Sequence, residues 1–288
     1  REIDLSTSTG HINYKEGNTT FSREYFCSYP DKVLVLKYNS DKKNSIDLNL
    51  GSRVIQKISS VSINNDEFEI SGKINGNDRP FRVLIKVEHK GGNLGQSGNQ
   101  LTLRGANEVV LYITMSTNYK MEYPDYLGEA PEIKNREVID KAMHKGYEEL
   151  KRAHLKDYKN LYDRVSLKLE TDNQLSKLPT NERFERLKSG SKDTGYKELA
   201  FNLGRYMVIS ASRKGTLPAN LQGVWNAFDF SPWAGNYQSN INIQEIYWSC
   251  GPLNLPECQQ PYIDWIDDLS ISGTEIAKEV YGSKGWIS

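Results

Sequence analysis

Histidine and cysteine are scarce in this sequence of 288 residues. The four histidines are His11, His89, His144 and His154, which argues against a Ser-His-Asp triad or a histidine-based metal site in the C-terminal half. The three cysteines are Cys27, Cys250 and Cys258, and no Cys-x-x-Cys pair occurs. A disulfide framework is therefore not expected. Cys250 and Cys258 could pair, but buried free thiols are the expected state.

An excess of one charge and long apolar runs are also missing. The 37 basic residues balance 37 acidic ones. Without a basic stripe, a nucleic-acid partner is not expected, and a neutral, hydroxyl-rich substrate fits better than a polyanion. No run approaches the ~18 apolar residues of a membrane span. The chain begins at Arg1 without a signal peptide and stops just after Trp286, so we expect a fragment without targeting segments.

Residues 1–130 have the pattern of an antiparallel β-sandwich. Short apolar-rich runs recur between turn-forming segments, and several of them alternate between apolar and polar residues. In Val33-Leu34-Val35-Leu36 both alternating sets are apolar, which predicts a strand buried on both faces. The glycine-rich loop 91–98 lacks the Gly-Lys-Ser/Thr ending of a phosphate-binding loop, so we predict a hairpin loop. The runs are residues 33–38, 45–50, 54–63, 68–74, 81–88, 101–103 and 109–115.

Residues 131–170 are predicted to be a helical linker with a short strand. From Asn135 to about Tyr162 apolar residues recur at intervals of three and four, as on one face of a helix. Asn135 is the candidate N-cap, because its short side chain can accept a hydrogen bond from a free amide of the first turn. Residues 165–169 alternate like one more strand.

Residues 171–288 are predicted to be a helical region that opens with a polar loop, residues 171–190. One helix is expected from about Asp193 to Arg213, ended by Gly215 and Pro218. Another is expected from about Pro261 to Tyr281, with Gly282 as its cap. The positions predicted to face inward in this last helix are Ile263, Ile266, Ile276, Ala277 and Val280.

Between those two helices, aromatic and amide side chains are concentrated in one segment. Seven aromatic residues occur among the 24 residues from Trp225 to Trp248, and eight Asn or Gln residues lie between Asn220 and Gln244. Aromatic rings suit the apolar faces of sugars, and amides both donate and accept hydrogen bonds to hydroxyls. The alternative is that the aromatic side chains fix the loop to the helices and the amides cap helix ends.

Asn240 and Asn242 are the candidate catalytic residues within this segment. In an extended backbone, residues two apart project to the same side, with Ile241 and Ile243 on the other. Two amides on one side could orient a water molecule. Because an amide does not titrate usefully, a carboxylate must act as the base.

Long motifs of this chain resemble glycoside hydrolase family 95, which contains α-1,2-L-fucosidases and α-L-galactosidases. The resemblance implies a multidomain α and β fold: an antiparallel β-super-sandwich over residues 1–130, a helical linker over 131–170, and the first helices of an (α/α)6 barrel over 171–288. The matching motifs are residues 217–226, Asn240-Ile241-Asn242, Tyr247-Trp248, residues 254–261 and residues 281–286. Residues 21–36 and 105–117 resemble the family's N-terminal β-domain, and residues 150–169 resemble its linker.

The resemblance also implies an exo-acting, inverting hydrolase for fucosylated or L-galactosylated oligosaccharides. It implies no metal or organic cofactor, and a periplasmic, cell-surface or secreted setting. In such an enzyme a glutamic acid protonates the leaving oxygen while an aspartate activates a water on the opposite face. Asn240 and Asn242 match the two asparagines that assist the aspartate. The residues expected to line or support the sugar pocket are Gln222, Trp225, Trp233 and Trp248.

The sequence departs from the family pattern in two respects. Ile246 stands where the family often has an asparagine before the Tyr-Trp pair, which is expected to alter the pocket. The catalytic glutamate and aspartate of the family lie beyond its Gly-Trp segment, so neither is assigned here. Glu245 is the carboxylate nearest to the asparagines, and we expect it to be a helix-start acid. The 288 residues alone are therefore expected to lack hydrolase activity.

A non-catalytic role is the rival hypothesis. The β-domain could be a carbohydrate-binding or interaction module on a helical scaffold. The sequence encoded after Ser288 discriminates between the two: a glutamate and an aspartate in a continuing helical barrel favour the enzyme, and a stop codon favours the binding module.

Overall fold

The computed structural model describes residues 1–170 and 172–287, and the chain forms two compact units. The first unit contains Arg1–Asp157 and Ile266–Ser288, and the second contains Tyr158–Trp265. The strands are β1 (Glu2–Asp4), β2 (Thr9–Glu16), β3 (Thr19–Ser28), β4 (Val33–Ser40), β5 (Ile46–Leu50), β6 (Lys57–Asn64), β7 (Glu67–Lys73), β8 (Pro80–Lys90), β9 (Asn93–Ser97), β10 (Gln100–Ala106) and β11 (Glu108–Thr117). The helices are α1 (Pro131–Tyr162), η1 (Leu175–Lys177), α2 (Thr180–Lys188), α3 (Thr194–Ala211), η2 (Pro232–Gly235), α4 (Asn242–Trp248) and α5 (Pro256–Tyr281).

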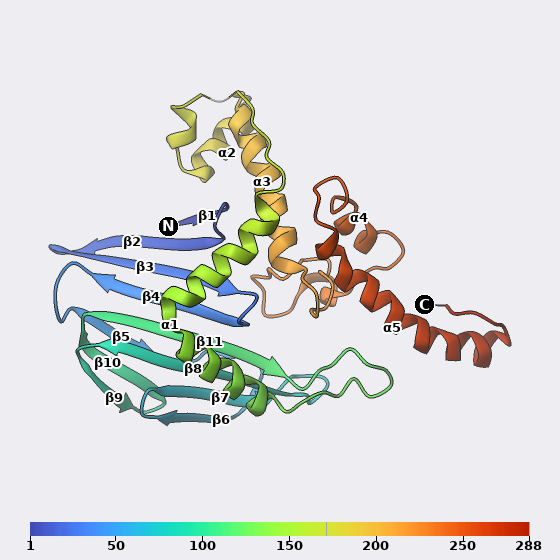
Figure 1. Ribbon diagram of the computed structural model, residues 1–288, viewed down its shortest axis with the longest axis horizontal. Coiled ribbons are helices and arrows are strands. Elements are labelled where there is room, and N and C mark those ends of the chain that lie inside the picture. The colour runs from blue at the N-terminus through green and yellow to red at the C-terminus, as the bar shows by residue number, and fades with distance from the viewer. Residues whose placement is uncertain (171, 288) are drawn as a thin grey trace. The chain divides into compact units, whose positions relative to one another are not determined.

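The strands of the first unit form two antiparallel sheets (Figure 1). The larger sheet has eight strands in the order β1-β2-β3-β4-β11-β8-β7-β6, and the smaller has three in the order β5-β10-β9. Their inner faces share one hydrophobic core, which confirms the predicted antiparallel sandwich. The segment 91–98, predicted to be a hairpin loop, instead contains strand β9, which pairs antiparallel with β10.

Strand β11 shows why the larger sheet is buried on both faces. Val109 and Leu111 pack into the core shared with the smaller sheet. Val110 and Tyr112 point to the opposite face, where they pack with Ile139 and Leu150 of α1. This alternation follows from the two-residue repeat of a strand. Val33 and Val35 of β4 face α1 in the same way, and Leu36 packs against the other core, as the run Val33-Leu34-Val35-Leu36 predicted.

The sequence pattern located seven strands and missed four. All seven predicted runs lie on strands, but β6 begins at Lys57 rather than near Val54. The reason is that the backbone carbonyl of Ile55 accepts a hydrogen bond from the Asn75 side chain instead of joining the ladder. Strands β1, β2, β3 and β9 carry many polar residues, so no apolar run marks them. The segment 165–169, predicted to be a strand, forms none.

Helix α1 begins four residues earlier than predicted, and Asn135 is not its N-cap. Pro131 is the first helical residue, a position where the missing amide hydrogen costs nothing. Asn135 is buried inside the helix. Its amide donates to the Arg82 carbonyl at 2.9 Å and accepts from the Ser116 hydroxyl at 2.7 Å. The side chain therefore ties α1 to the sheet instead of capping the helix.

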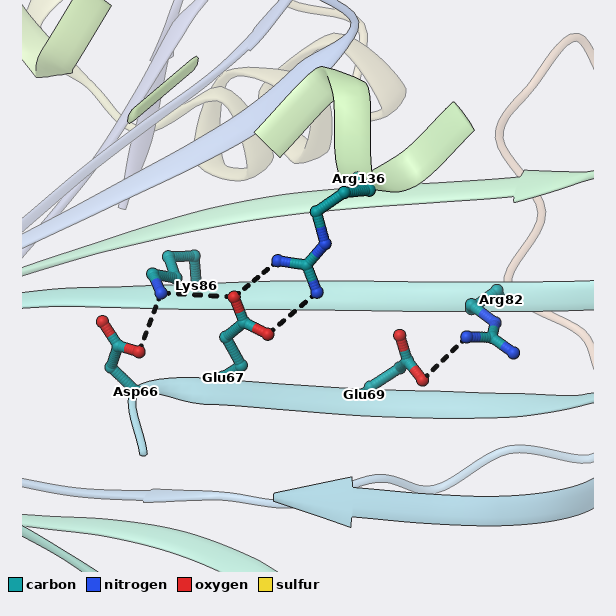
Figure 2. A network of polar contacts seen from close by, with 6 residues as sticks. All are labelled: Asp66, Glu67, Glu69, Arg82, Lys86 and Arg136. Carbon is teal, nitrogen blue, oxygen red and sulfur yellow. Dashed lines mark hydrogen bonds and ion pairs between the residues drawn. The ribbon is translucent and has the colours of Figure 1, made fainter. Parts of the chain in front are cut away.

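A network of charges also fastens α1 to the larger sheet (Figure 2). Arg136 of α1 makes two hydrogen bonds to the carboxylate of Glu67, at 2.6 and 2.9 Å. Lys86 bridges Glu67 and Asp66 at 3.2 and 2.8 Å. The hydrogen bond from Arg136, together with that from Lys86, holds the pKa of Glu67 below its usual value despite partial burial.

We expect Glu67→Gln to lower the free energy of unfolding by about 1 kcal/mol at pH 7, a modest value because the Arg136 side chain is 46% exposed. A carboxyl group whose pKa is lower in the folded state stabilises the fold at pH values above 4.5, its pKa in the unfolded chain. This contribution is lost as the pH falls through the pKa of the folded state. Urea unfolding from pH 7 to pH 3 should show the wild-type and variant curves converging in acid. A difference in unfolding free energy between wild type and variant that stays constant over this pH range would contradict the link between the Glu67 pKa and stability.

The second unit is helical, and the region 171–190 is more ordered than predicted. This region contains η1 and α2. Its first residue, 171, lies outside the described residues. The predicted helix start near Asp193 is confirmed, and Asp193 is the N-cap of α3, where its side chain accepts from the Tyr196 amide. The same carboxylate receives two hydrogen bonds of 2.8 Å from Arg183 of α2. This nearly buried ion pair fixes α2 to the start of α3.

The long helix α5 begins at Pro256, ahead of the predicted start at Pro261. Gly282 caps it with a positive φ, and the amides of Gly282 and Ser283 donate to the carbonyls of Lys278 and Ala277. This is the predicted glycine cap. The predicted inward stripe is wrong in part, because Ile263, Ile276 and Val280 are exposed. Among the described residues, no helix combines the length and apolar composition needed to cross a lipid bilayer.

Candidate active-site segment

Tyr247 of α4 anchors the aromatic and amide-rich segment, residues 219–248, to the helices around it. Its hydroxyl accepts a hydrogen bond from the Ala219 amide at 2.8 Å and lies 2.7 Å from the Ser212 hydroxyl. Ser212 in turn donates to the Cys258 carbonyl at 2.7 Å. The ring of Tyr247 stacks on Tyr262 with centroids 5.2 Å apart. One buried tyrosine therefore joins the start of the segment to its end.

Replacing Tyr247 by phenylalanine is expected to destabilise the protein by about 2 kcal/mol, because the buried Ala219 amide would lose its acceptor while the ring stacking is kept. Urea unfolding followed by tryptophan fluorescence measures the loss. Tyr281→Phe is the matched control, since that tyrosine is exposed. A loss no larger than that of the control would mean that the hydroxyl does not anchor the segment.

Cys250 and Cys258 lie in the same core as Tyr247. Both are buried free thiols, as the sequence predicted. Burial raises the pKa of Cys250 to about 11 and that of Cys258 to about 12, so both carry their protons at neutral pH. Ile246, the departure from the family pattern, packs partly buried against this core.

Gln222 uses its side chain to close the loop that precedes η2. Its amide nitrogen donates to the Pro232 carbonyl at 2.6 Å, and its amide oxygen accepts from the Ser231 hydroxyl at 3.0 Å. The Leu221 amide donates to the Asn236 carbonyl across the same loop. Gln222 thus shapes the loop, and a contact to a substrate would use its second amide hydrogen or the second lone pair of its amide oxygen.

The aromatic residues of the segment divide into two groups. Tyr237 and Tyr247 pack in the helical core. Trp233 and Trp248 are 76% and 64% exposed, and Trp225 is 39% exposed with its ring beside Tyr206. Some aromatic side chains therefore fix the segment in place, while the tryptophans are exposed to different degrees and their contact with a sugar stays a prediction.

Trp233 adopts an unusual backbone conformation. Its φ is 56° and that of Ala234 is 55°, both in the left-handed region that side chains with a Cβ seldom occupy. Such strain is found where function requires a side chain in a given position. The side chain of Trp233 has most of its surface exposed.

Asn240 and Asn242 are close in sequence but are not on an extended backbone, so that prediction is wrong. Asn240 lies in a turn, and Asn242 is the first residue of α4. Ile243 and Tyr247 are buried four residues apart, a spacing that selects a helix because both can then face one core. Both asparagines are exposed at the start of α4. Glu245 lies in the first turn, as expected of a helix-start acid.

Sequence reasoning overlooked Gln244, which follows the asparagines. Its amide nitrogen donates to the Ser239 carbonyl at 2.6 Å, but its amide oxygen is buried without a hydrogen-bond partner. An unpaired buried acceptor is costly, and it marks a place where a hydroxyl or a water could donate. No sequence signal distinguished Gln244 from the other amides of the segment. Within the described residues, no cluster of histidine, cysteine or acidic side chains could hold a metal ion.

Comparison with known proteins assigns both parts of the chain. Residues 146–288 match the model of the glycosyl hydrolase family 95 catalytic domain. Residues 1–122 match the model of the glycosyl hydrolase family 65 N-terminal domain.

Curated relatives align with the whole chain. It is 33% identical to Alpha-L-fucosidase 2 of Arabidopsis thaliana and 30% identical to Probable alpha-fucosidase A of Aspergillus niger. In each case 100% of this chain aligns with 38% of the relative, so the chain spans well under half the length of both.

A solved structure shares the fold. The putative kojibiose phosphorylase from human microbiome superposes on 99% of this chain with a TM-score of 0.59, at 12% sequence identity and over 37% of its own length. The fold prediction is thereby confirmed: an antiparallel β-sandwich precedes the helices of a barrel domain.

Proposed function

We propose that this chain, whose residues 146–288 match the glycosyl hydrolase family 95 catalytic domain, is part of an exo-acting, inverting glycosidase that releases L-fucose or L-galactose from α-linked glycans. The observation that carries the proposal is the exposed surface of the segment 219–248. There Trp233 and Trp248 lie in the family's catalytic domain together with Asn240 and Asn242 at the start of α4. We keep the domain limits 1–130, 131–170 and 171–288 as part of this proposal.

The proposed reaction is a single displacement at the anomeric carbon. A water attacks this carbon from the face opposite the glycosidic oxygen, and the bond between the carbon and that oxygen breaks. A carboxylate takes a proton from the water while a carboxylic acid gives one to the leaving oxygen. We assign neither carboxyl group to this chain. Asn240 and Asn242 would hold the water in line, and the exposed tryptophans would contact the apolar face of the sugar.

Proton NMR of the first-formed sugar tests the mechanism in the full-length enzyme that contains this chain. From an α-linked fucoside such as 2′-fucosyllactose we expect β-L-fucose to appear first, followed by mutarotation. First-formed α-L-fucose would contradict inversion, and no release of fucose would contradict the substrate class. The 288-residue chain serves as the control and is expected to be inactive, because it would lack both carboxyl groups.

A further inference from the structure

We propose that the β-sandwich carries a second, non-catalytic binding site for a neutral sugar, in a pocket on β2, β3, β4 and β5. We call it the Arg23 pocket, with Tyr14, Arg23, Tyr38, Glu16, Asn39 and Asp47 as the residues that define it. It lies within the first unit and uses none of the residues proposed for hydrolysis. The inference therefore holds or fails independently of the proposed catalytic function.

The pocket exists because the two sheets differ in width. Strand β5 is an edge strand of the three-stranded sheet. Leu36 and Tyr38 of β4 still pack toward the shared core, but β2 contributes no residue to it. Beside β5 the inner face of β2, β3 and β4 is therefore open as a pocket of about 440 Å³. Binding sites for small molecules commonly have volumes of about 300–1,000 Å³.

Arg23 stands in the middle of this pocket, held between two aromatic rings. Tyr14 and Phe21 are directly paired across β2 and β3, and their rings stack with centroids 5.2 Å apart. Arg23 pairs with Tyr38 across β3 and β4. Its guanidinium carbon lies 5.2 Å from the ring centroids of both Tyr14 and Tyr38. Cation–π contacts on both sides fix the guanidinium in one orientation.

The guanidinium is nevertheless poorly satisfied as a donor. The one hydrogen bond found for it among the described residues runs from Nη2 to the Tyr14 hydroxyl at 3.2 Å. Its Nε is buried and has no partner, and the guanidinium makes no ion pair within the described residues. A guanidinium has five N–H donors, and buried donors are normally paired. The buried Nε is out of reach of a ligand, so the donors that can bind one are those of the two terminal nitrogens, of which one N–H is used by the Tyr14 hydroxyl.

The surrounding side chains favour a neutral sugar over an anion. Glu16 and Asp47 line the same pocket as Arg23, so the lining carries more negative than positive charge. They would oppose a phosphate or a carboxylate. Glu16 can accept hydrogen bonds from hydroxyls, whereas one oxygen of Asp47 already accepts from the Gly105 amide at 2.8 Å. Phe21 and Leu48 add apolar surface for the C–H face of a sugar ring.

Saturation-transfer NMR on the whole chain tests the proposal. The neutral probes are 2′-fucosyllactose and lactose, and the anionic probe is D-galacturonate. We expect the neutral probes to bind in the millimolar range. Arg23→Met keeps an unbranched apolar stem between the rings and removes the donors, so it should weaken binding at least about tenfold. Glu16→Gln, on an exposed side chain, should weaken it by a smaller factor.

Two control variants make the result specific. Lys57→Met removes an exposed cation from β6, at the opposite edge of the sheet, and should leave binding unchanged. Glu245→Gln, in the second unit, should also leave it unchanged. Thermal unfolding checks that Arg23→Met is folded. Preference for D-galacturonate, failure of every probe to bind, or unaltered binding by both Arg23→Met and Glu16→Gln would each overturn the proposal.

Discussion

Replacing Asn242 by alanine in the full-length enzyme is expected to lower kcat for 2′-fucosyllactose by at least about 100-fold. The physical reason is that a nucleophilic water must be held in line with the bond that breaks, and loss of such positioning costs factors of this size. KM should change little, because the asparagine would contact the attacking water and not the bound sugar. Initial rates over a range of substrate concentrations measure both parameters.

The structure supplies a matched control for this variant. Glu245 lies in the first turn of the same helix and is also exposed. Glu245→Gln removes a carboxylate close to the asparagines but should leave kcat within about twofold, because a helix-start acid acts only through the helix dipole. Alanine is a good helix former, so Asn242→Ala should not disturb α4. Undiminished turnover of Asn242→Ala would contradict the water-positioning role. A large loss of kcat in Glu245→Gln would instead indicate that Glu245 is a catalytic acid.

The second large effect concerns stability. Asp193→Asn is expected to lower the free energy of unfolding by about 3 kcal/mol at pH 7. Asparagine keeps an acceptor for the Tyr196 amide, so the cap of α3 is retained. What is lost is the charge opposite Arg183, in an ion pair whose side chains are only 8% and 6% exposed. The variant therefore leaves a guanidinium in a nearly buried position without its partner.

Dependence on pH separates this effect from a loss of packing. The hydrogen bonds from Arg183 hold the pKa of Asp193 below its ordinary value of 3.8. A carboxyl group whose pKa is lower in the folded state stabilises the fold at pH values above its pKa in the unfolded chain. This stabilisation is lost as the pH falls through the pKa of the folded state. Urea unfolding should therefore show a gap between wild type and variant that is constant near pH 7 and narrows below about pH 4.

Two further variants complete the comparison. Glu182→Gln changes an exposed acid on the same helix as Arg183 and should cost less than about 0.5 kcal/mol. Arg183→Met combined with Asp193→Asn should recover part of the loss, because the uncompensated charge is then removed as well. If Asp193→Asn costs no more than Glu182→Gln, the ion pair does not hold α2 to α3.

The sequence by itself determined those elements whose pattern is local. The run Val33-Leu34-Val35-Leu36 specified a strand buried on two faces, because neighbouring side chains of a strand point to opposite sides. Asp193 and Gly282 marked helix ends, since a short acceptor and a residue free to adopt positive φ satisfy the groups exposed there. Family motifs located the candidate site for the same reason, as they are contiguous in the chain.

Only the tertiary structure decided the positions that depend on partners distant in sequence. Asn135 looked like a cap, but its hydrogen bonds with the Arg82 carbonyl and the Ser116 hydroxyl fix it inside α1. Asn240 and Asn242 looked extended, but the core that receives Ile243 and Tyr247 makes their segment a turn and a helix. The Arg23 pocket has no sequence signature at all. Its residues come from separate strands, and only the different widths of the two sheets leave them open to solvent.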